Sequence, residues 1–294
     1  MRYAEQPKRF SYSQVFNEPG NQSATSYGSE CIQPGNTGSE DCLFLNIFTT
    51  YLPDNVVASQ LKPVMFYIHG GGFLSGSGSL SEYDGGNLAS RGDVVVVTIN
   101  YRLGAFGFLV LDDGSTNGNF GLADQIVALD WVIANIASFG GDPERITIFG
   151  QSAGAISVTA LLGSPKAVGK FAAAMPMSNL GGFGSAANYD DYPSIDAGAI
   201  LMGGPTLAAT GCINATSQLG CLRAYPASEL ALYGTSAVYA IPQKARLFRT
   251  ELIILGILLW TAHMSTLLIL SWTALDILHM SLCLWATCVM KQLS

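Results

Sequence analysis

Residues 94–99 limit the possible folds of this chain more than any other segment. They are four valines, a threonine and an isoleucine, without alternation of apolar and polar residues. β-branched residues favour strands, and a strand without alternation is buried on both faces. Such strands are typical of a mainly parallel sheet covered by helices on both sides. This segment therefore predicts an α/β layer architecture.

Three further apolar runs and one helical pattern indicate the same architecture. Residues 43–48 and 64–68 are predicted strands, and residues 146–149 form the next one. Residues 121–139 carry apolar side chains at helical spacing, and the two glycines that follow are expected to end this helix. Strands that alternate with helices favour an α/β fold with a mainly parallel sheet.

The composition excludes disorder and a nucleic-acid partner. Of the 294 residues, 49% are apolar and 12% are charged, against roughly 25% charged in an average soluble protein. Such a chain can bury a large core. The formal net charge is −7 and no cluster of Lys or Arg is present, whereas nucleic-acid binding needs a basic surface.

The last fifth of the chain differs from the rest. Residues 1–240 hold 32 of the 33 glycines, and three of the four tryptophans lie in residues 241–294. We therefore expect a domain over 1–240 and an apolar helical tail over 241–294. Residues 252–275 carry no formal charge and would measure about 36 Å as a helix at ~1.5 Å per residue, enough to span a membrane.

The origin of this tail has two interpretations. The basic residues Lys244, Arg246 and Arg249 precede the segment and would place that side in the cytoplasm. This orientation conflicts with an exported domain on the same side. The alternative, which we favour, is a tail foreign to the domain, such as the translation of an unspliced or frameshifted region.

The cysteines leave two possibilities open. Cys31 and Cys42, like Cys212 and Cys221, are spaced to close short loops by disulfides in an oxidising compartment; buried reduced thiols are the alternative. The sequons at Asn21 and Asn214 fit a secreted glycoprotein. The polar N-terminal residues do not resemble a signal peptide, so we expect any export signal to lie outside this chain. No C-x-x-C pair is present and histidine is scarce, so we expect no metal and no cofactor.

The strongest chemical motif is Gly150-Gln151-Ser152-Ala153-Gly154. It follows the predicted strand 146–149 and precedes a predicted helix over 155–162. A serine is a useful nucleophile only when its hydroxyl is held exposed beside a base. A sharp strand-to-helix turn provides that exposure, and flanking glycines relieve the crowding of the turn.

A second motif, His69-Gly70-Gly71-Gly72-Phe73, follows the predicted strand 64–68. Successive glycines can direct backbone N–H groups at the oxyanion that forms during acyl transfer. A phosphate loop is the alternative, but it would continue with Lys-Ser or Lys-Thr, whereas Leu-Ser follows Phe73. Together with the serine motif, the segment favours an oxyanion hole.

With these motifs the chain resembles the type-B carboxylesterase/lipase family, which includes cholinesterases and fungal lipases. The resemblance covers residues 1 to about 240. The segments that carry it, besides the two motifs, are Ser-Glu-Asp-Cys-Leu-Phe-Leu-Asn at 39–46, Asn-Tyr-Arg-Leu-Gly at 100–104, Asn-Phe-Gly-Leu-Ala-Asp-Gln at 119–125 and Phe-Gly-Gly-Asp-Pro at 139–143. It implies a partial, truncated α/β-hydrolase fold, secretion, and hydrolysis of small-molecule or lipid esters through an acyl-enzyme.

The resemblance also assigns roles to residues of this chain. Ser152 corresponds to the nucleophile, and Gly71, Gly72 and Ala153 to the oxyanion-hole donors. The pairs Cys31/Cys42 and Cys212/Cys221 correspond to two family disulfides. Structural ion pairs, without a catalytic role, are implied for Asp41, Arg102, Asp142 and Arg145.

Two family motifs are not found after Ser152. A serine esterase of this fold also needs an acid and then a histidine. Neither the Asp-Glu-Gly motif of the acid nor the Gly-x-x-His motif of the base is present in these 294 residues. Asp276 and His279 are three residues apart, but they lie in the apolar tail. We therefore expect impaired hydrolysis; the alternative is a non-catalytic, truncated or membrane-tethered fragment that contacts the membrane through 252–275.

Overall fold

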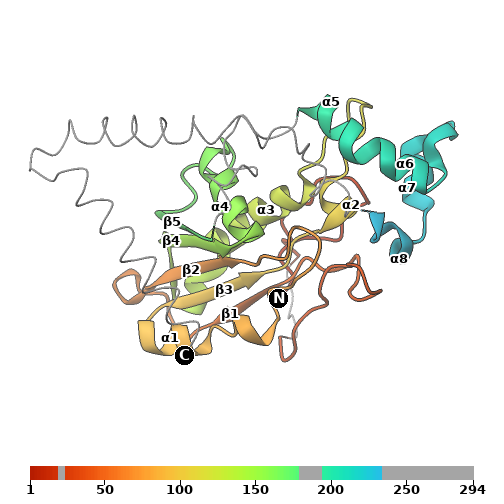
Figure 1. Ribbon diagram of the computed structural model, residues 1–294. Coiled ribbons are helices and arrows are strands. Elements are labelled where there is room, and N and C mark those ends of the chain that lie inside the picture. Colours follow the sequence, from red (N-terminus) through yellow and green to blue (C-terminus); the bar gives the residue numbers. More distant parts are fainter. Residues whose placement is uncertain (19–23, 179–193, 234–294) are drawn as a thin grey trace, which may run out of the picture. The chain divides into compact units, whose positions relative to one another are not determined.

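The fold was analysed in a computed structural model, which describes residues 1–18, 24–178 and 194–233 (Figure 1). The chain divides into two units, Met1–Pro242 and Gln243–Ser294, and the described residues all belong to the first. The predicted tail 241–294, including the candidate membrane segment 252–275 and the pair Asp276 and His279, lies outside the described residues.

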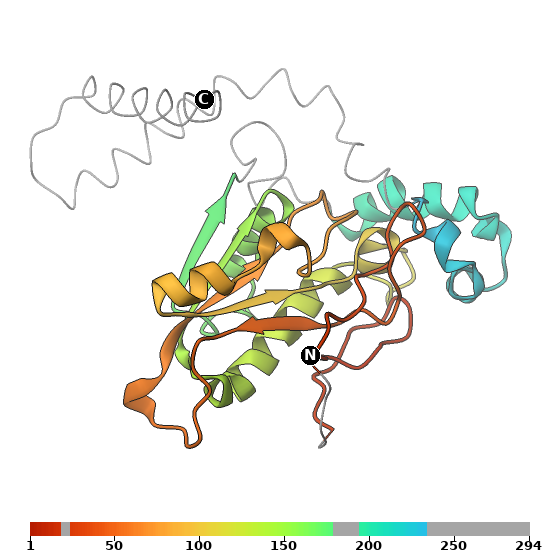
Figure 2. The same cartoon turned by 90° about the horizontal axis from the view of Figure 1, so that it is seen from below.

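A sheet of five strands forms the centre of the described part. The strands are β1 (Leu45–Phe48), β2 (Lys62–Ile68), β3 (Val95–Ile99), β4 (Gly141–Gln151) and β5 (Ala173–Met177). Their order is β1-β3-β2-β4-β5, with β1 antiparallel to β3 and the other neighbouring strands parallel. Figure 2 shows β1 and β5 at opposite edges. The mainly parallel sheet is confirmed.

Helices cover both faces of this sheet. Figure 1 shows α1 (Gly86–Gly92) on one face and α3 (Phe120–Asn135) with α4 (Ala153–Gly163) on the other. This division follows from right-handed crossovers, because the chain moves from β2 to β3 in one direction and from β3 through β4 to β5 in the other. The remaining helices are α2 (Gly104–Phe108), α5 (Ile195–Gly198), α6 (Gly204–Ala209), α7 (Gln218–Ala224) and α8 (Ala227–Leu230).

The apolar side chains form two buried clusters. The larger cluster lies around the sheet, and all five residues of β3 are buried in it or beside it, as its sequence predicts. The smaller cluster joins α2 to the later helices through residues such as Phe106, Met202, Leu222 and Leu230. A π-helical turn, Ala199–Gly203, connects α5 to α6.

The structure changes the bounds of several predicted elements and adds others. β1 begins at Leu45 instead of residue 43. β4 begins at Gly141 instead of residue 146, because Gly141 pairs with Lys62 of β2 across a register shift. The predicted helix ends as a 3-10 turn, Ile136–Phe139, before Gly140 adopts a left-handed conformation. β5, α1, α2 and α5 to α8 were not predicted, because their short segments show no clear apolar period.

One helix in the described residues meets the length and hydropathy criteria for a membrane span. It is Phe120–Phe139, that is α3 with its 3-10 extension, with a mean hydropathy of 1.3. This helix packs against the sheet and half of it is buried, so its apolar character is explained by the core.

Candidate active site

Ser152 occupies a sharp turn between β4 and α4. Its φ of 56° and ψ of −119° lie in a region that residues with a side chain rarely adopt. Its N–H donates to the Met177 carbonyl at the end of β5, at 3.1 Å. Its carbonyl accepts from the Ile156 N–H and begins the helix. The turn exposes part of the Ser152 side chain at the carboxyl end of the sheet.

The two glycines of the serine motif are required by close backbone contacts. A Cβ on Gly154 would lie 2.0 Å from the Ile68 carbonyl oxygen, and a Cβ on Gly150 would lie 2.7 Å from the same atom. Neither distance is compatible with a side chain. The glycines therefore allow α4 to begin directly against the end of β2, which carries the second motif.

The second motif forms a tight loop, residues 69–76, which we call the glycine loop. Gly71, Gly72 and Phe73 have φ values of 103°, 63° and 61°. The Gly71 carbonyl accepts from the N–H groups of Leu74 and Ser75, and the Phe73 carbonyl accepts from the Gly104 N–H at 2.7 Å. A Cβ on Gly71 would lie 2.1 Å from the Ser75 carbonyl oxygen, so this position requires glycine.

The glycine loop lies directly against the serine turn. β2 and β4 are adjacent and parallel, with Ile68 opposite Gly150, so the two segments leave the sheet side by side. A Cβ on Gly70 would lie 3.3 Å from the Ser152 Cβ and 2.7 Å from the Gln151 carbonyl oxygen. The two predicted motifs, about 80 residues apart in the sequence, are thus brought together.

Three backbone donors near this contact remain available. Within the described part of the chain, the N–H groups of Gly71, Gly72 and Ala153 donate to no other residue, and the Ser152 hydroxyl makes no hydrogen bond. Unpaired backbone donors at a helix start and in a left-handed loop are able to bind a developing oxyanion.

His69 lies in the core and not beside the serine hydroxyl. Its ring is fully buried, stacks on Tyr101 at 4.4 Å and places Nδ1 2.7 Å from the Gly70 carbonyl. The Tyr101 hydroxyl donates to the His69 carbonyl. Burial lowers the pKa of His69 to about 4, so the ring is neutral at pH 7. Because the Gly70 carbonyl can only accept a hydrogen bond, Nδ1 carries the ring proton and donates it to that carbonyl.

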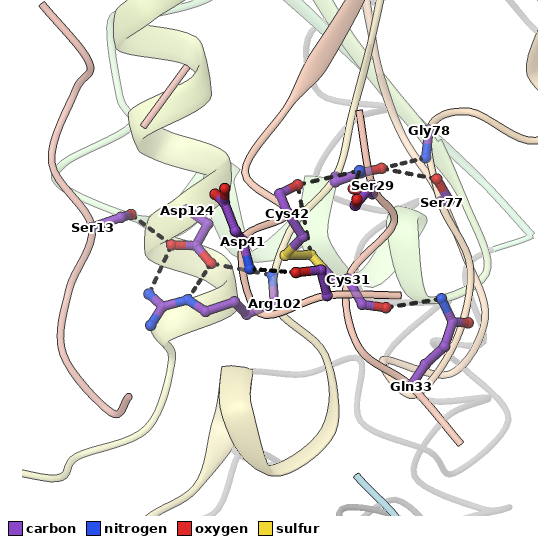
Figure 3. The surroundings of a disulfide bond; sticks show 12 residues. Ser13, Ser29, Cys31, Gln33, Asp41, Cys42, Ser77, Gly78, Arg102 and Asp124 are labelled. Atoms are coloured by element: carbon purple, nitrogen blue, oxygen red, sulfur yellow. Dashed lines mark hydrogen bonds and ion pairs between the residues drawn. A yellow bond between two sulfur atoms is a disulfide. The ribbon is translucent and has the colours of Figure 1, made fainter. Parts of the chain in front are cut away.

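The charged residues that the resemblance marked as structural are paired. Arg102 donates to the fully buried Asp124 at 2.7 Å, and Asp124 also accepts from Ser13 (Figure 3). Arg145 pairs with Asp142, and Arg2 pairs with Asp41 at 2.5 Å. The hydrogen bond from Arg2 lowers the pKa of Asp41. The sequence did not indicate Asp124 as the partner of Arg102.

Both cysteine pairs form disulfides. The Cα atoms of Cys31 and Cys42 are 4.8 Å apart, and those of Cys212 and Cys221 are 5.7 Å apart. Figure 3 shows the first disulfide beside the Arg102–Asp124 pair. The expected pairing is confirmed, and buried reduced thiols are excluded for these four cysteines.

Comparison with known proteins shows the family of this chain. The sequence profile of the carboxylesterase family matches residues 1–249. The chain belongs to the carboxylesterase family. It is 49% identical over 160 residues to para-nitrobenzyl esterase of Bacillus subtilis (strain 168), covering 50% of this chain and 32% of that protein. It is 46% identical over 172 residues to bile salt-activated lipase of Mus musculus, covering 55% and 28%.

Solved carboxylesterase structures show the same fold. A carboxylesterase of Geobacillus stearothermophilus superposes with a TM-score of 0.70 at 40% identity, covering 82% of this chain and 49% of that one. The partial α/β-hydrolase fold is therefore confirmed. The chain spans about a third of the length of the curated carboxylesterases that it matches and about half of the solved ones.

The sequence of this carboxylesterase-family chain did not indicate the contacts behind the serine turn. Gln125 of α3 donates to the Ser157 hydroxyl of α4 at 3.0 Å, and both residues are buried. Gln125 lies in a segment that carried the resemblance, but no spacing rule connects it to Ser157. The sequence also did not indicate the contact of the Met177 carbonyl with Ser152, because β5 was not predicted.

Proposed function

We propose that this chain carries the acyl-transfer half of a serine carboxylesterase site. Ser152 is the nucleophile that attacks the carbonyl carbon of a carboxylic ester. The N–H groups of Gly71, Gly72 and Ala153 bind the resulting oxyanion. Collapse of the intermediate breaks the ester C–O bond, the proton of the serine hydroxyl leaves with the alcohol, and the acyl group stays on Ser152. Water then hydrolyses this acyl-enzyme and releases the acid. The single observation that carries this proposal is the contact between the glycine loop and the strained turn at Ser152.

The proposed site is weakly reactive, because no base lies beside the serine in the described residues. A serine hydroxyl needs a histidine to remove its proton. His69 is buried and bonded to Gly70, and His263 and His279 lie outside the described residues. Serine proteases that lack a triad member keep roughly 10³–10⁴-fold acceleration over water from binding and the oxyanion hole. We expect no more than this here.

The two disulfides support an oxidising compartment, and we propose that the chain functions outside the cytosol. Asn214 is exposed at the end of a 3-10 turn in the second disulfide loop, so the sequon at this residue is accessible for glycosylation. The proposed substrate is a small-molecule or lipid ester.

Activity and covalent labelling test the proposal together. The chain is assayed with p-nitrophenyl acetate and with a fluorophosphonate probe, each beside a Ser152→Ala control. We expect slow labelling that Ser152→Ala abolishes, and turnover far below the ~10 s⁻¹ of ordinary enzymes. Absence of Ser152-dependent labelling would refute the nucleophile and favour the non-catalytic fragment. Turnover at tens per second would show that an unassigned base operates.

A further inference from the structure

Gln33 connects the first disulfide to the glycine loop. Its carboxamide nitrogen donates to the Cys31 carbonyl at 3.0 Å (Figure 3). The same nitrogen donates to the Gly76 carbonyl at 3.3 Å. Its carboxamide oxygen accepts from the Gly76 N–H at 2.9 Å. Gln33 is only 7% exposed. One buried side chain therefore holds both polar groups of the last residue of the glycine loop.

Asn100 makes the equivalent connection from the other half-cystine. Its nitrogen donates to the Cys42 carbonyl at 3.2 Å, and its oxygen accepts from the Ser77 hydroxyl at 3.0 Å and the Gly78 N–H at 2.8 Å. Asn100 is 2% exposed. Two carboxamides thus tie three consecutive residues, 76–78, to the two carbonyls of one cross-link.

Gly76 packs against the start of the glycine loop, which in turn contacts the serine turn. It has a φ of 109°, and a Cβ there would lie 2.6 Å from His69 Nδ1 and 2.8 Å from the Gly70 carbonyl oxygen. Gly70 in turn lies against Ser152. Glycine-rich segments are flexible unless other groups fix them, and oxyanion donors work only when they are held in place before the reaction.

We propose that Gln33 is a positioning residue that transmits the rigidity of the Cys31–Cys42 loop to the oxyanion-hole donors Gly71 and Gly72. This inference rests on the proposed function, because it gives the glycine loop that role. Gln33 does not touch the reacting atoms. It acts through its contacts with Gly76, which packs against Gly70. Asn100 holds Ser77 and Gly78 by hydrogen bonds.

The chain also supplies a matched control. Gln218 lies in the other disulfide loop and donates from its carboxamide to the Ile213 carbonyl at 2.8 Å. It has no hydrogen bond to the glycine loop among the described residues. The pair Gln33→Leu and Gln218→Leu therefore makes the same substitution in two disulfide loops, only one of which reaches the proposed site. Gln33→Asn, which is one methylene too short to bridge Cys31 and Gly76, serves if Gln33→Leu does not fold.

Two measurements on the full chain test the proposal. Hydrogen exchange of a peptide covering residues 70–78 reports on the loop without requiring activity. The saturating rate and the half-saturation concentration of Ser152 phosphonylation separate transition-state stabilisation from probe binding. We expect Gln33→Leu to accelerate exchange at least about tenfold and to lower the saturating rate about 10- to 100-fold. The half-saturation concentration should match that of Gln218→Leu, and urea unfolding of both variants checks that each is folded under the assay conditions.

Each outcome decides the proposal. If amide hydrogen exchange in residues 70–78 is equally fast in Gln33→Leu and Gln218→Leu, the proposal is overturned, whatever the labelling shows. Faster exchange with an unchanged saturating rate also overturns it, because the loop would then move without consequence for Ser152. If the parent chain is not labelled at Ser152, the proposed function fails, and the exchange comparison alone still decides whether Gln33 anchors the loop.

Discussion

At the scale of single residues, burial makes the stability of the chain depend on the protonation of His69. Burial lowers its pKa from the ordinary 6.5 to about 4, because the core disfavours the charged ring. The unfolded chain therefore binds the proton between these two values, whereas the folded chain does not. Stability from this group is complete above pH 6.5 and is lost as the pH falls towards 4.

We predict that the free energy of unfolding falls by about 2 kcal/mol from His69 alone between pH 7 and pH 5. Urea unfolding at both pH values measures it. In His69→Gln the fall should largely disappear, even if that variant is less stable at pH 7, because its side chain cannot titrate. An equal fall in both proteins would show that other groups cause it.

At the scale of elements, the junction between β2 and α4 determines where Ser152, the proposed nucleophile, lies. A Cβ on Gly154, in the first turn of α4, would lie 2.0 Å from the Ile68 carbonyl oxygen and 3.0 Å from the His69 carbonyl oxygen. Backbone atoms of a central strand cannot move aside without disturbing the sheet. Any side chain at residue 154 therefore separates the serine turn from the glycine loop.

We predict that Gly154→Ala lowers the free energy of unfolding by about 3 kcal/mol or more. It should also reduce fluorophosphonate labelling of Ser152. Gly92→Ala is the matched control, because its Cβ would meet no atom closer than 3.5 Å and alanine favours helix α1 by up to ~1 kcal/mol. Urea unfolding compares the two. Similar midpoints for both variants would contradict the close contact at Gly154.

At the scale of the whole molecule, β5 is an edge strand of the described sheet. It pairs with β4 on one side and with no other strand in residues 1–18, 24–178 and 194–233. Its side chains are exposed or half-buried, and Met175 is 42% exposed. Open apolar edges are sites of strand-to-strand aggregation, and a lysine on the edge opposes it.

We predict that Met175→Lys raises the soluble, monodisperse fraction of the purified chain. Val168→Lys is the control, because Val168 is 63% exposed but lies outside any strand. Light scattering and size-exclusion chromatography measure the difference. An equal improvement in both variants would mean that added charge, and not the strand edge, controls aggregation.

The sequence by itself determined the sheet layers and the two motifs of the proposed site. Apolar runs rich in β-branched and aromatic residues specify buried strands, so β2 and β3 were predicted to within two residues. The glycine spacing around Ser152 reflects local backbone geometry, which a short motif can encode. Family resemblance, and not spacing, supplied the cysteine pairing that the structure confirms.

Only the tertiary structure decided what supports those motifs. Gln33 and Gly76 are 43 residues apart, Gln125 and Ser157 are 32 apart, and Met177 reaches Ser152 from an unpredicted strand. None of these residues has a local pattern that indicates its partner. Their hydrogen bonds exist because β2, β3, β4 and β5 pair in an order that differs from the chain order. That order results from packing over the whole domain.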